Sequence, residues 1–158
     1  MLGRLYTVQF DNVSVSAAQD LFEITPADDK PLEIVGLFLS QTGVADVGDA
    51  AEECLPVQII RGFTSSGSGG SAPTPAPVKR VDAAAGFTAE VNNTTLATTG
   101  TTVTIHSDNF NVRVGYQNWW PEGTEPDASQ ANTTIVVRLT RAPADAITLS
   151  GTLYIREG

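Results

Sequence analysis

The sequence predicts an all-β protein, an antiparallel β-sandwich of jelly-roll-like type. Three observations lead to this prediction: short segments of alternating apolar and polar residues recur along the 158 residues, turn-forming residues separate them, and no segment has strand-helix-strand spacing. About eight to ten strands are expected, as in sandwiches and barrels. A chain of this length buries enough surface to fold without a disulfide or a metal, so we expect one domain, residues 1–158.

Charge and composition limit the classes of partner that this protein is expected to bind. Eighteen acidic against nine basic residues give a net charge of -9, which repels phosphate backbones and anionic membranes. Nucleic acid and membranes are therefore not expected as partners, and no apolar run approaches the roughly 18 residues that span a bilayer. The single Cys54 cannot form an internal disulfide. Met1 to Arg4 lead directly into an alternating segment, which predicts a protein made in the cytoplasm without a signal peptide.

The first part of the chain predicts two strands and a tight loop. The residues expected to face the core are Tyr6, Val8, Phe10, Phe22 and Ile24. Between the two strands, residues 16–19 (SAAQ) have the form of a capping box and predict one short helical turn. Residues 26–31 carry two prolines and two aspartates, which favour a tight loop.

Residues 32–39 (LEIVGLFL) predict a central strand that is covered on both faces, because they are nearly continuously apolar. Gly36 within it indicates a bulge or a close approach of another group. Residues 49–52 (DAAE) predict a second capped helical turn. A strand follows over 55–59, and Pro56 predicts that this strand lies at an edge or a bulge.

The second half repeats the strand pattern. Residues 82–86 favour one more helical turn, and a strand begins at Phe87. Val103 and Ile105 are expected to face inward, and Asp108-Asn109 predicts the turn of a hairpin between 102–107 and 110–116. The last two strands have inward-facing residues of a single parity, namely Ile135, Val137, Leu139, Ile147, Leu149, Gly151, Leu153 and Ile155.

The segment from Gly62 to Val78 is low in complexity and divides the two halves. Its Gly and Ser residues favour a mobile coil, whereas prolines at every second position favour an extended arm. Those prolines are Pro73, Pro75 and Pro77. The segment is either a disordered linker or a long surface loop that orders against a partner. As a contact arm it would run from Phe63 to Val78.

No group of residues predicts catalysis, a cofactor or a metal. His106 is the single histidine, and its parity places it on the polar side of its strand, so we expect a surface histidine rather than a general base. Glu122, Glu125 and Asp127 lie in one loop, 117–131, and are not opposed across a cleft as glycosidase carboxylates must be. The sequence therefore predicts a protein that is not an enzyme.

The aromatic residues before that loop are the more informative feature. Trp119 and Trp120 are adjacent, so they cannot both face one core from a strand, and at least one is expected to meet a loop, a neighbouring subunit or a ligand. Tyr116, Pro121 and Tyr154 extend this surface. A protein interface, a platform for a sugar ring and packing under the loop remain open.

Several segments resemble a family of short proteins encoded among the virion genes of tailed bacteriophages and prophages. They are residues 17–24 (AAQDLFEI), 26–31 (PADDKP), 61–62 with 65–75 (RG and SSGSGGSAPTP), 90–95 (EVNNTT) and 150–154 (SGTLY). The family carries no catalytic motif, so the resemblance transfers no active residue. It implies a structural role in the virion as a capsid decoration (cement) protein, with a minor tail or fibre protein as the next possibility.

The resemblance and the residues together give one expectation. The chain is expected to form a homotrimer on the capsid surface and to bind the major capsid protein, with no cofactor. The expected contacts are Phe63, Pro73, Pro75, Pro77, Tyr116, Trp119, Trp120 and Pro121. The alternative is a receptor-binding protein in which Tyr116, Trp119 and Trp120 stack on sugar rings.

Overall fold

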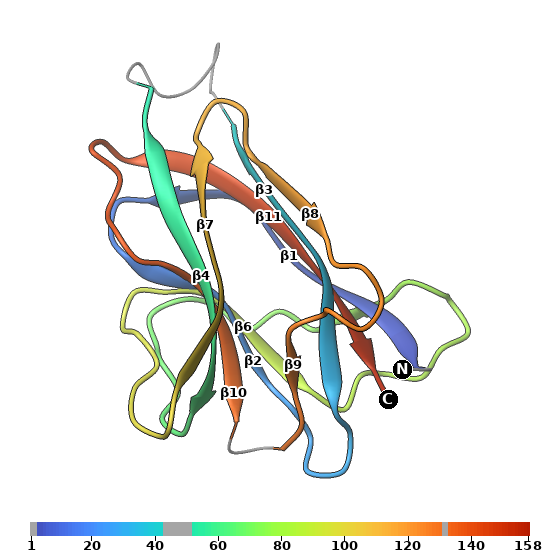
Figure 1. Cartoon of the computed structure of the whole chain (residues 1–158). Coiled ribbons are helices and arrows are strands. Elements are labelled where there is room, and N and C mark those ends of the chain that lie inside the picture. The colour runs from blue at the N-terminus through green and yellow to red at the C-terminus, as the bar shows by residue number, and fades with distance from the viewer. Residues whose placement is uncertain (1–2, 43–51, 131–132) are drawn as a thin grey trace.

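The computed structural model describes residues 3–42, 52–130 and 133–158, and it consists of two antiparallel sheets packed face to face (Figure 1). Sheet A contains, in order, β5 (Ala76–Pro77), β1 (Arg4–Val15), β11 (Ile147–Glu157), β3 (Leu32–Gln41) and β8 (Tyr116–Trp119), and β9 (Asp127–Ala128) also pairs with β3. Sheet B contains, in order, β6 (Thr88–Asn93), β2 (Gln19–Thr25), β10 (Thr134–Leu139), β4 (Cys54–Phe63) and β7 (Val103–Asn111). The prediction of an all-β antiparallel sandwich is confirmed.

The path of the chain between the sheets is that of a jelly roll. The chain alternates between sheet A and sheet B through β1, β2, β3 and β4, and again through β7, β8, β10 and β11. Two four-stranded sets, β1-β11-β3-β8 and β2-β10-β4-β7, therefore face each other. The first and last strands pair from Arg4 opposite Glu157 to Val15 opposite Ile147, so the two ends of the chain lie together (Figure 1).

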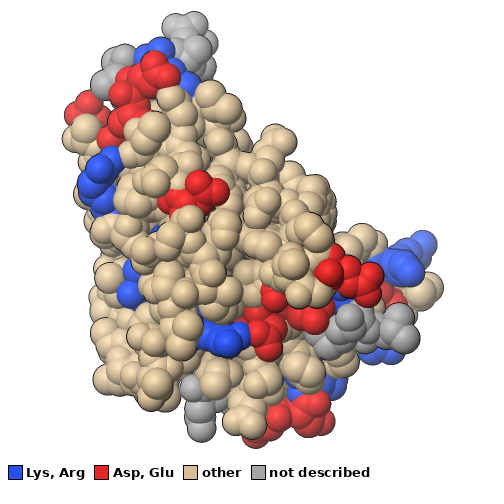
Figure 2. Space-filling view, viewed as in Figure 1, with Lys and Arg blue, Asp and Glu red and all other residues tan. Residues whose placement is uncertain are grey.

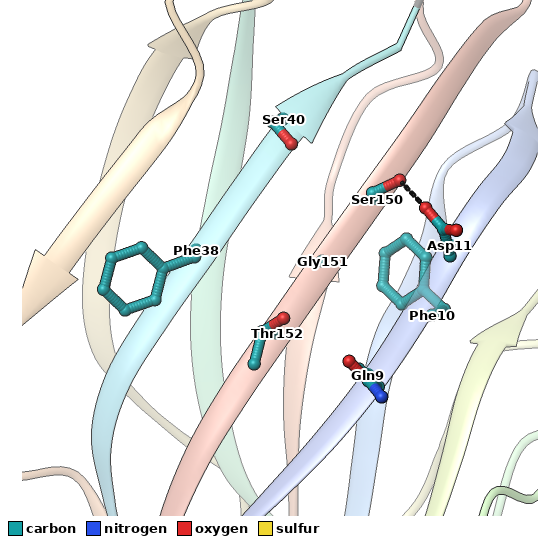
Figure 3. Close-up of a pocket in the computed structure, with 8 residues that line it drawn as sticks. All are labelled: Gln9, Phe10, Asp11, Phe38, Ser40, Ser150, Gly151 and Thr152. Carbon is teal, nitrogen blue, oxygen red and sulfur yellow. Dashed lines mark hydrogen bonds between the residues drawn. The ribbon is translucent and has the colours of Figure 1, made fainter.

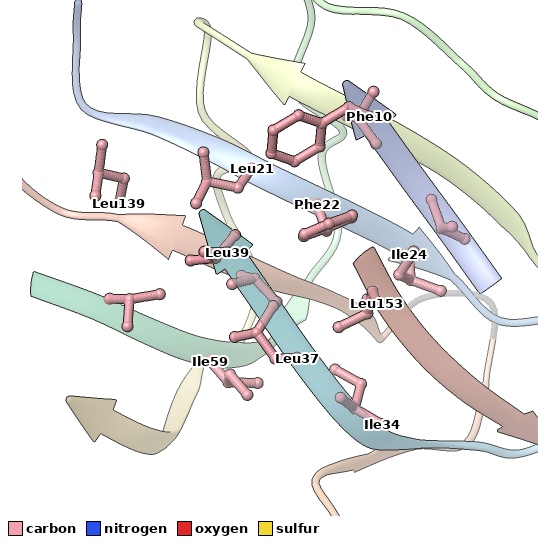
Figure 4. Packing of buried hydrophobic residues seen from close by; sticks show 14 of the residues in the cluster. Phe10, Leu21, Phe22, Ile24, Ile34, Leu37, Leu39, Ile59, Leu139 and Leu153 are labelled. Carbon is pink, nitrogen blue, oxygen red and sulfur yellow. The ribbon is translucent and has the colours of Figure 1, made fainter. Parts of the chain in front are cut away.

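One hydrophobic core fills the space between the sheets (Figure 4). It is formed by the inward residues of both sheets, which alternate with outward residues along each strand. Fully buried members include Tyr6, Phe22, Ile24, Ile34, Leu37, Leu39, Ile59 and Leu139. The inward parity predicted for β1, β2, β10 and β11 agrees with this core, and β11 buries every second residue from Ile147 to Glu157.

The predicted short helical turns are wrong wherever the structure describes them. Residues 16–18 form a bend and β2 begins at Gln19, whose side-chain Nε2 donates to Asn92 Oδ1 (2.9 Å) while the side chain makes no capping bond to residue 16. Residues 82–86 contain bends and coil. A capping box stabilises a helix only where a helical apolar stripe follows it, and here strand residues follow. The turn predicted at 49–52 lies outside the described residues except for its last residue.

The hairpin predicted for 102–116 is also wrong. β7 continues through Asp108 and Asn109, and the chain turns at residues 111–115 to enter the other sheet as β8. Val103 and Ile105 lie exposed, whereas His106 stands opposite the buried Ile59 and so takes the inward side. A bulge between Ile59 and Ile60 shifts the register of β4 and β7, which reverses the parity of the residues beyond it.

The central position predicted for β3 is confirmed, but its outer face is only partly covered, since Glu33 and Phe38 are half-buried. The edge or bulge predicted for Pro56 is wrong. β3 lies inside sheet A between β11 and β8, and a bulge at Val35, next to Gly36, interrupts its pairing with β11. Pro56 was expected at an edge or a bulge, but β4 lies inside sheet B between β10 and β7. The proline is tolerated because β10 has ended at this level, where the Thr140 amide donates to the Pro56 carbonyl (3.3 Å).

Candidate binding surfaces

An aromatic cluster on the outer face of sheet A is the first candidate site. The Trp119 ring centroid lies 4.8 Å from that of Tyr154 and 5.1 Å from that of Phe38, and the Phe38 and Tyr154 centroids are 5.7 Å apart. These residues come from β8, β11 and β3, which are neighbours in the sheet. The contacts of Phe38 are edge-on, an arrangement that aromatic quadrupoles favour. The three rings form one rigid apolar surface.

Gly36 holds this cluster in place. It pairs with Trp119 across β3 and β8, and a Cβ atom at this position would lie 2.6 Å from Trp119 Cε3. The indole therefore rests directly on the backbone of β3. Even so, 55% of Trp119 remains exposed to solvent. A large aromatic side chain that is both fixed and exposed is typical of the anchor of a binding surface.

The two tryptophans face different ways, as their adjacency requires. Trp120 is half-buried, and its ring centroid lies 5.4 Å from that of His106, in the gap between β7 and β8. Pro121 is exposed directly after it. Tyr116 is buried and packs against Phe110, so it does not belong to the exposed surface. Of the predicted aromatic contacts, the structure brings Trp119 together with Tyr154 and adds Phe38, which the sequence reasoning missed.

The gap between β7 and β8 contains a polar pair formed by His106 and Tyr116. Tyr116 Oη lies 2.9 Å from His106 Nε2, and Asp108 Oδ2 lies 3.7 Å from the same nitrogen. Burial, together with the negative charge of Asp108, raises the pKa of Tyr116 to about 12. The phenol therefore stays neutral near neutral pH. His106 is not the surface residue that its parity predicted, because it faces this gap.

The Gly/Ser-rich segment is ordered against its own molecule. Residues 64–71, here called the strap, form antiparallel bridges with the stretch 91–98 on the outer side of sheet B: Ser65 with Thr98, Ser68 with Thr95 and Ser71 with Val91. A Cβ atom at Gly67 or Gly70 would lie 2.2 Å or 1.9 Å from a backbone oxygen of that stretch. The glycines thus permit close backbone contact, and the strap is a surface layer rather than a free arm.

Buried carboxylates fix the strap and the neighbouring loop. Glu23 accepts hydrogen bonds from the Ser66 hydroxyl (2.6 Å), the Gly67 amide (3.0 Å) and the Asn93 side chain (2.9 Å). Asp20, which is fully buried, pairs with Arg138 Nε (2.6 Å) and accepts from the Ala97 amide (2.8 Å). These bonds explain why polar residues of β2 are buried on the outward side of sheet B.

The remaining predicted contact residues lie around the strap. Phe63 is buried in a small second cluster with Ile60, Ala97 and Val136, and Arg138 lies over its ring at 4.8 Å. It is therefore not available to a partner at the surface. The prolines Pro73, Pro75 and Pro77 are half-buried. Pro77 belongs to β5, which covers the edge of β1 beside Tyr6. Pro77 thus helps to protect this sheet edge.

The described part of the loop predicted over 117–131, residues 117–130, contains residues paired in a sheet. It includes the end of β8 and the short strand β9, both paired with β3. Glu125 accepts a hydrogen bond from the Gly123 amide (2.6 Å), and Arg156 lies 3.4 Å from both Glu125 and Glu33. Hydrogen bonds from its own amide and from that of Gly123, with the charge of Arg156, lower the pKa of Glu125.

Charge is distributed in small groups over the surface. Figure 2 shows a face on which uncharged side chains predominate, with acidic and basic residues in small groups that adjoin one another in several places. Among the described residues, no three His, Cys, Asp or Glu side chains are placed to hold a metal ion together. Nor does that part of the chain contain a helix long and apolar enough to cross a membrane.

Comparison of the chain with family models, curated proteins and solved structures gives no match.

Proposed function

We propose that this chain is a non-enzymatic structural protein of a tailed-phage virion that decorates the capsid. In this proposal it is made in the host cytoplasm and binds the major capsid protein as a homotrimer on the shell. Two lines of support are independent of each other. The first is the resemblance of residues 17–24, 26–31, 61–62, 65–75, 90–95 and 150–154 to virion-gene products, and the second is the surface of sheet A.

The single observation that carries the proposal is the exposed, immobilised Trp119. Interfaces derive most of their binding free energy from a few large aromatic side chains that are already held in the bound geometry. Gly36, Tyr154 and Phe38 hold Trp119 in this way without burying it. We therefore place the contact with the shell at the aromatic cluster and the adjacent Pro121.

We do not assign this contact to the strap. Its backbone bridges residues 91–98 and its Ser66 and Gly67 are bonded to Glu23, so the groups that a free arm would offer to a partner are already engaged within this molecule. In the proposal it reinforces the sandwich. A rigid module suits decoration because several identical contacts in one trimer add to an avidity that no single contact supplies.

The test is the occupancy of Trp119→Ala protein on virions. The variant, purified and mixed with shells that lack this protein, is expected to bind at least about 10-fold more weakly, as for loss of a central aromatic contact. Val81→Ala is the matched control, because Val81 is 91% exposed and lies outside the aromatic cluster. Circular dichroism establishes that both variants are folded. Equal occupancy of the two variants would overturn the assignment of the contact.

A minor tail or fibre protein is the alternative location for the same module. Imaging of intact particles separates the two, since a decoration protein gives repeated density on the shell and a tail protein gives density only at the tail. Density on neither part would remove the virion role altogether.

A further inference from the structure

A shallow hollow of about 400 Å³ lies on the outer face of sheet A beside the aromatic cluster (Figure 3). Three neighbouring strands contribute to it. Gln9 of β1 stands opposite Thr152 of β11, which stands opposite Phe38 of β3, so the three side chains form one row across the sheet. Ser150 and Ser40 form the next row. This volume falls within the range of clefts that bind small molecules.

The hollow exists because small residues lie between larger ones. Ser40, Ser150 and Gly151 fill little space between Phe38 on one side and Gln9 on the other. Gly151 also lacks a side chain toward the core, where the Phe10 ring occupies the space, 2.8 Å from the position that a Cβ atom would take. Figure 3 shows the Phe10 ring behind the strands and the polar side chains in front of it. The floor is thus firmly packed.

Several hydrogen-bonding groups around the hollow are uncommitted. Within the described part of the chain, the side chains of Gln9, Ser40 and Thr152 have no hydrogen-bond partner. Asp11 accepts from the Ser150 hydroxyl (2.8 Å), and that hydroxyl oxygen accepts from the Asn12 amide (3.0 Å). This pair is fixed before any ligand arrives, and the second carboxylate oxygen of Asp11 remains available as an acceptor.

The lining selects a class of ligand by its charge and polarity. Of the eight residues that line the hollow, none is Lys or Arg, and Asp11 is the one charged side chain, so phosphates, sulfates and carboxylates are repelled. A purely apolar ligand would leave the amide and hydroxyl groups without water or partners. A sugar ring presents hydroxyl groups at its rim and C–H groups on its faces, which match these polar groups and the Phe38 ring.

We propose that the hollow binds a neutral saccharide, with Gln9, Asp11 and Thr152 bonding its hydroxyl groups and Phe38 contacting a ring face. This site goes beyond the proposed contact with the shell. It uses the β1 and β11 side of sheet A, whereas the shell contact uses the β8 side, and Phe38 borders both.

The test is a nuclear magnetic resonance titration of the whole protein. The neutral probes are maltotetraose, chitotetraose and lacto-N-tetraose, and 6'-sialyllactose is the anionic probe. At least one neutral probe is expected to shift the amide signals of residues 9–11 and 150–152, with dissociation constants on the order of millimolar, as for a shallow site with few contacts. Absence of shifts with all neutral probes, shifts elsewhere, or preference for the anionic probe would each overturn the proposal.

Variants assign the site to its residues. Thr152→Val keeps the shape and removes the hydroxyl, and it is expected to weaken binding of the neutral probe about 5-fold or more, as for loss of one hydrogen bond. Thr148→Val is the matched control on the same strand and face, outside the hollow. Equal affinity of Thr152→Val and Thr148→Val would contradict the assignment. Shell occupancy of Thr152→Val tests whether the saccharide site is independent of the shell contact. It is expected to be unchanged for Thr152→Val and to fall for Trp119→Ala.

Discussion

The pKa of Tyr116 is set by the groups around it in the folded protein. Its hydroxyl meets His106 in the gap between the sheets, and burial with the nearby Asp108 raises its pKa from an ordinary value of 10.0 to about 12. The folded protein therefore holds this proton over a pH range in which the unfolded chain releases it. Stability linked to Tyr116 is fully present below pH 10 and is lost as the pH rises toward 12.

The first prediction concerns Tyr116→Phe. The difference in free energy of unfolding between wild type and variant is expected to be constant up to about pH 9.5. Between pH 10 and 12 the free energy of unfolding of the wild type should fall relative to that of the variant, because phenylalanine cannot ionise. Urea unfolding at a series of pH values measures it. Alkaline titration of phenolate absorbance is expected to lose the tyrosine that titrates near 12. A difference independent of pH would contradict the assigned pKa.

The second prediction concerns Gly36→Ala. The added methyl group would lie 2.6 Å from Trp119 Cε3, so the indole must move away from β3. We expect a loss of about 1 to 3 kcal/mol in the free energy of unfolding, as for overpacking. Acrylamide should also quench tryptophan fluorescence more strongly. In a Trp119→Ala background the same substitution should cost less, because the obstructing ring is gone; an equal cost would show that the contact is unimportant.

At the scale of elements, the strap and the adjoining loop depend on a few buried charges. Asp20 pairs with Arg138 and also holds the Ala97 amide, while an exposed pair of the same chemistry joins Arg61 to Asp127. The exposed pair is solvated whether or not it forms. The buried pair leaves an uncompensated charge when one partner is removed.

The third prediction compares these two pairs. Asp20→Ala is expected to lower the free energy of unfolding by about 3 to 5 kcal/mol. Asp127→Ala, the matched control, is expected to cost at most about 1 kcal/mol, as for surface ion pairs. Denaturant unfolding of both variants measures the difference, and hydrogen exchange should show loss of protection at residues 65–71 and 95–98 for Asp20→Ala alone. Similar small losses for both would show that Asp20 does not organise this layer.

The inward and outward residues of a strand could be predicted only where its alternation of apolar and polar residues continues without a bulge. β11 alternates from end to end because it lies between β1 and β3 with the core on one side, so its inward residues followed directly from the sequence. β7 could not be predicted in the same way, since a bulge that leaves Ile105 without a pairing partner on β4 reverses its parity, and no local residue pattern marks that bulge.

The candidate sites were predictable only in part for the same reason. The opposite orientation of Trp119 and Trp120 follows from their adjacency, but Phe38 joins the cluster through the pairing of β3 with β8, which no local pattern reveals. The strap was expected to be mobile or to await a partner. Its glycines instead permit contact with residues 91–98, and composition alone does not distinguish flexibility from close approach.

At the scale of the whole molecule, the pairing of β1 with β11 brings the two ends together. Residue 4 stands opposite residue 157, so a short linker could join them without crossing either sheet. The turn between β2 and β3 exposes Asp28 and Asp29, and neither residue belongs to a strand of either sheet. Chain connectivity there contributes little to packing.

The fourth prediction is that the fold tolerates circular permutation. A chain that joins residue 158 to residue 1 through a short Gly/Ser linker and opens between Asp28 and Asp29 should give the same far-ultraviolet circular dichroism spectrum and cooperative unfolding. A permutant opened between Gly36 and Leu37, inside β3, is the comparison and should not fold, because it divides a central strand. Failure of the first permutant would show that the β2–β3 connection is required to establish the topology.

The same antiparallel pairing of β1 and β11 determines how the molecule responds to mechanical force. A force applied between the two ends would act first on the β1–β11 hydrogen bonds nearest Arg4 and Glu157. Those bonds would then break one after another along the strands. Antiparallel strands that are pulled from the same end share the load poorly. A tension transmitted through the body of the sandwich, across many rungs at once, would meet far greater resistance than one transmitted through its ends.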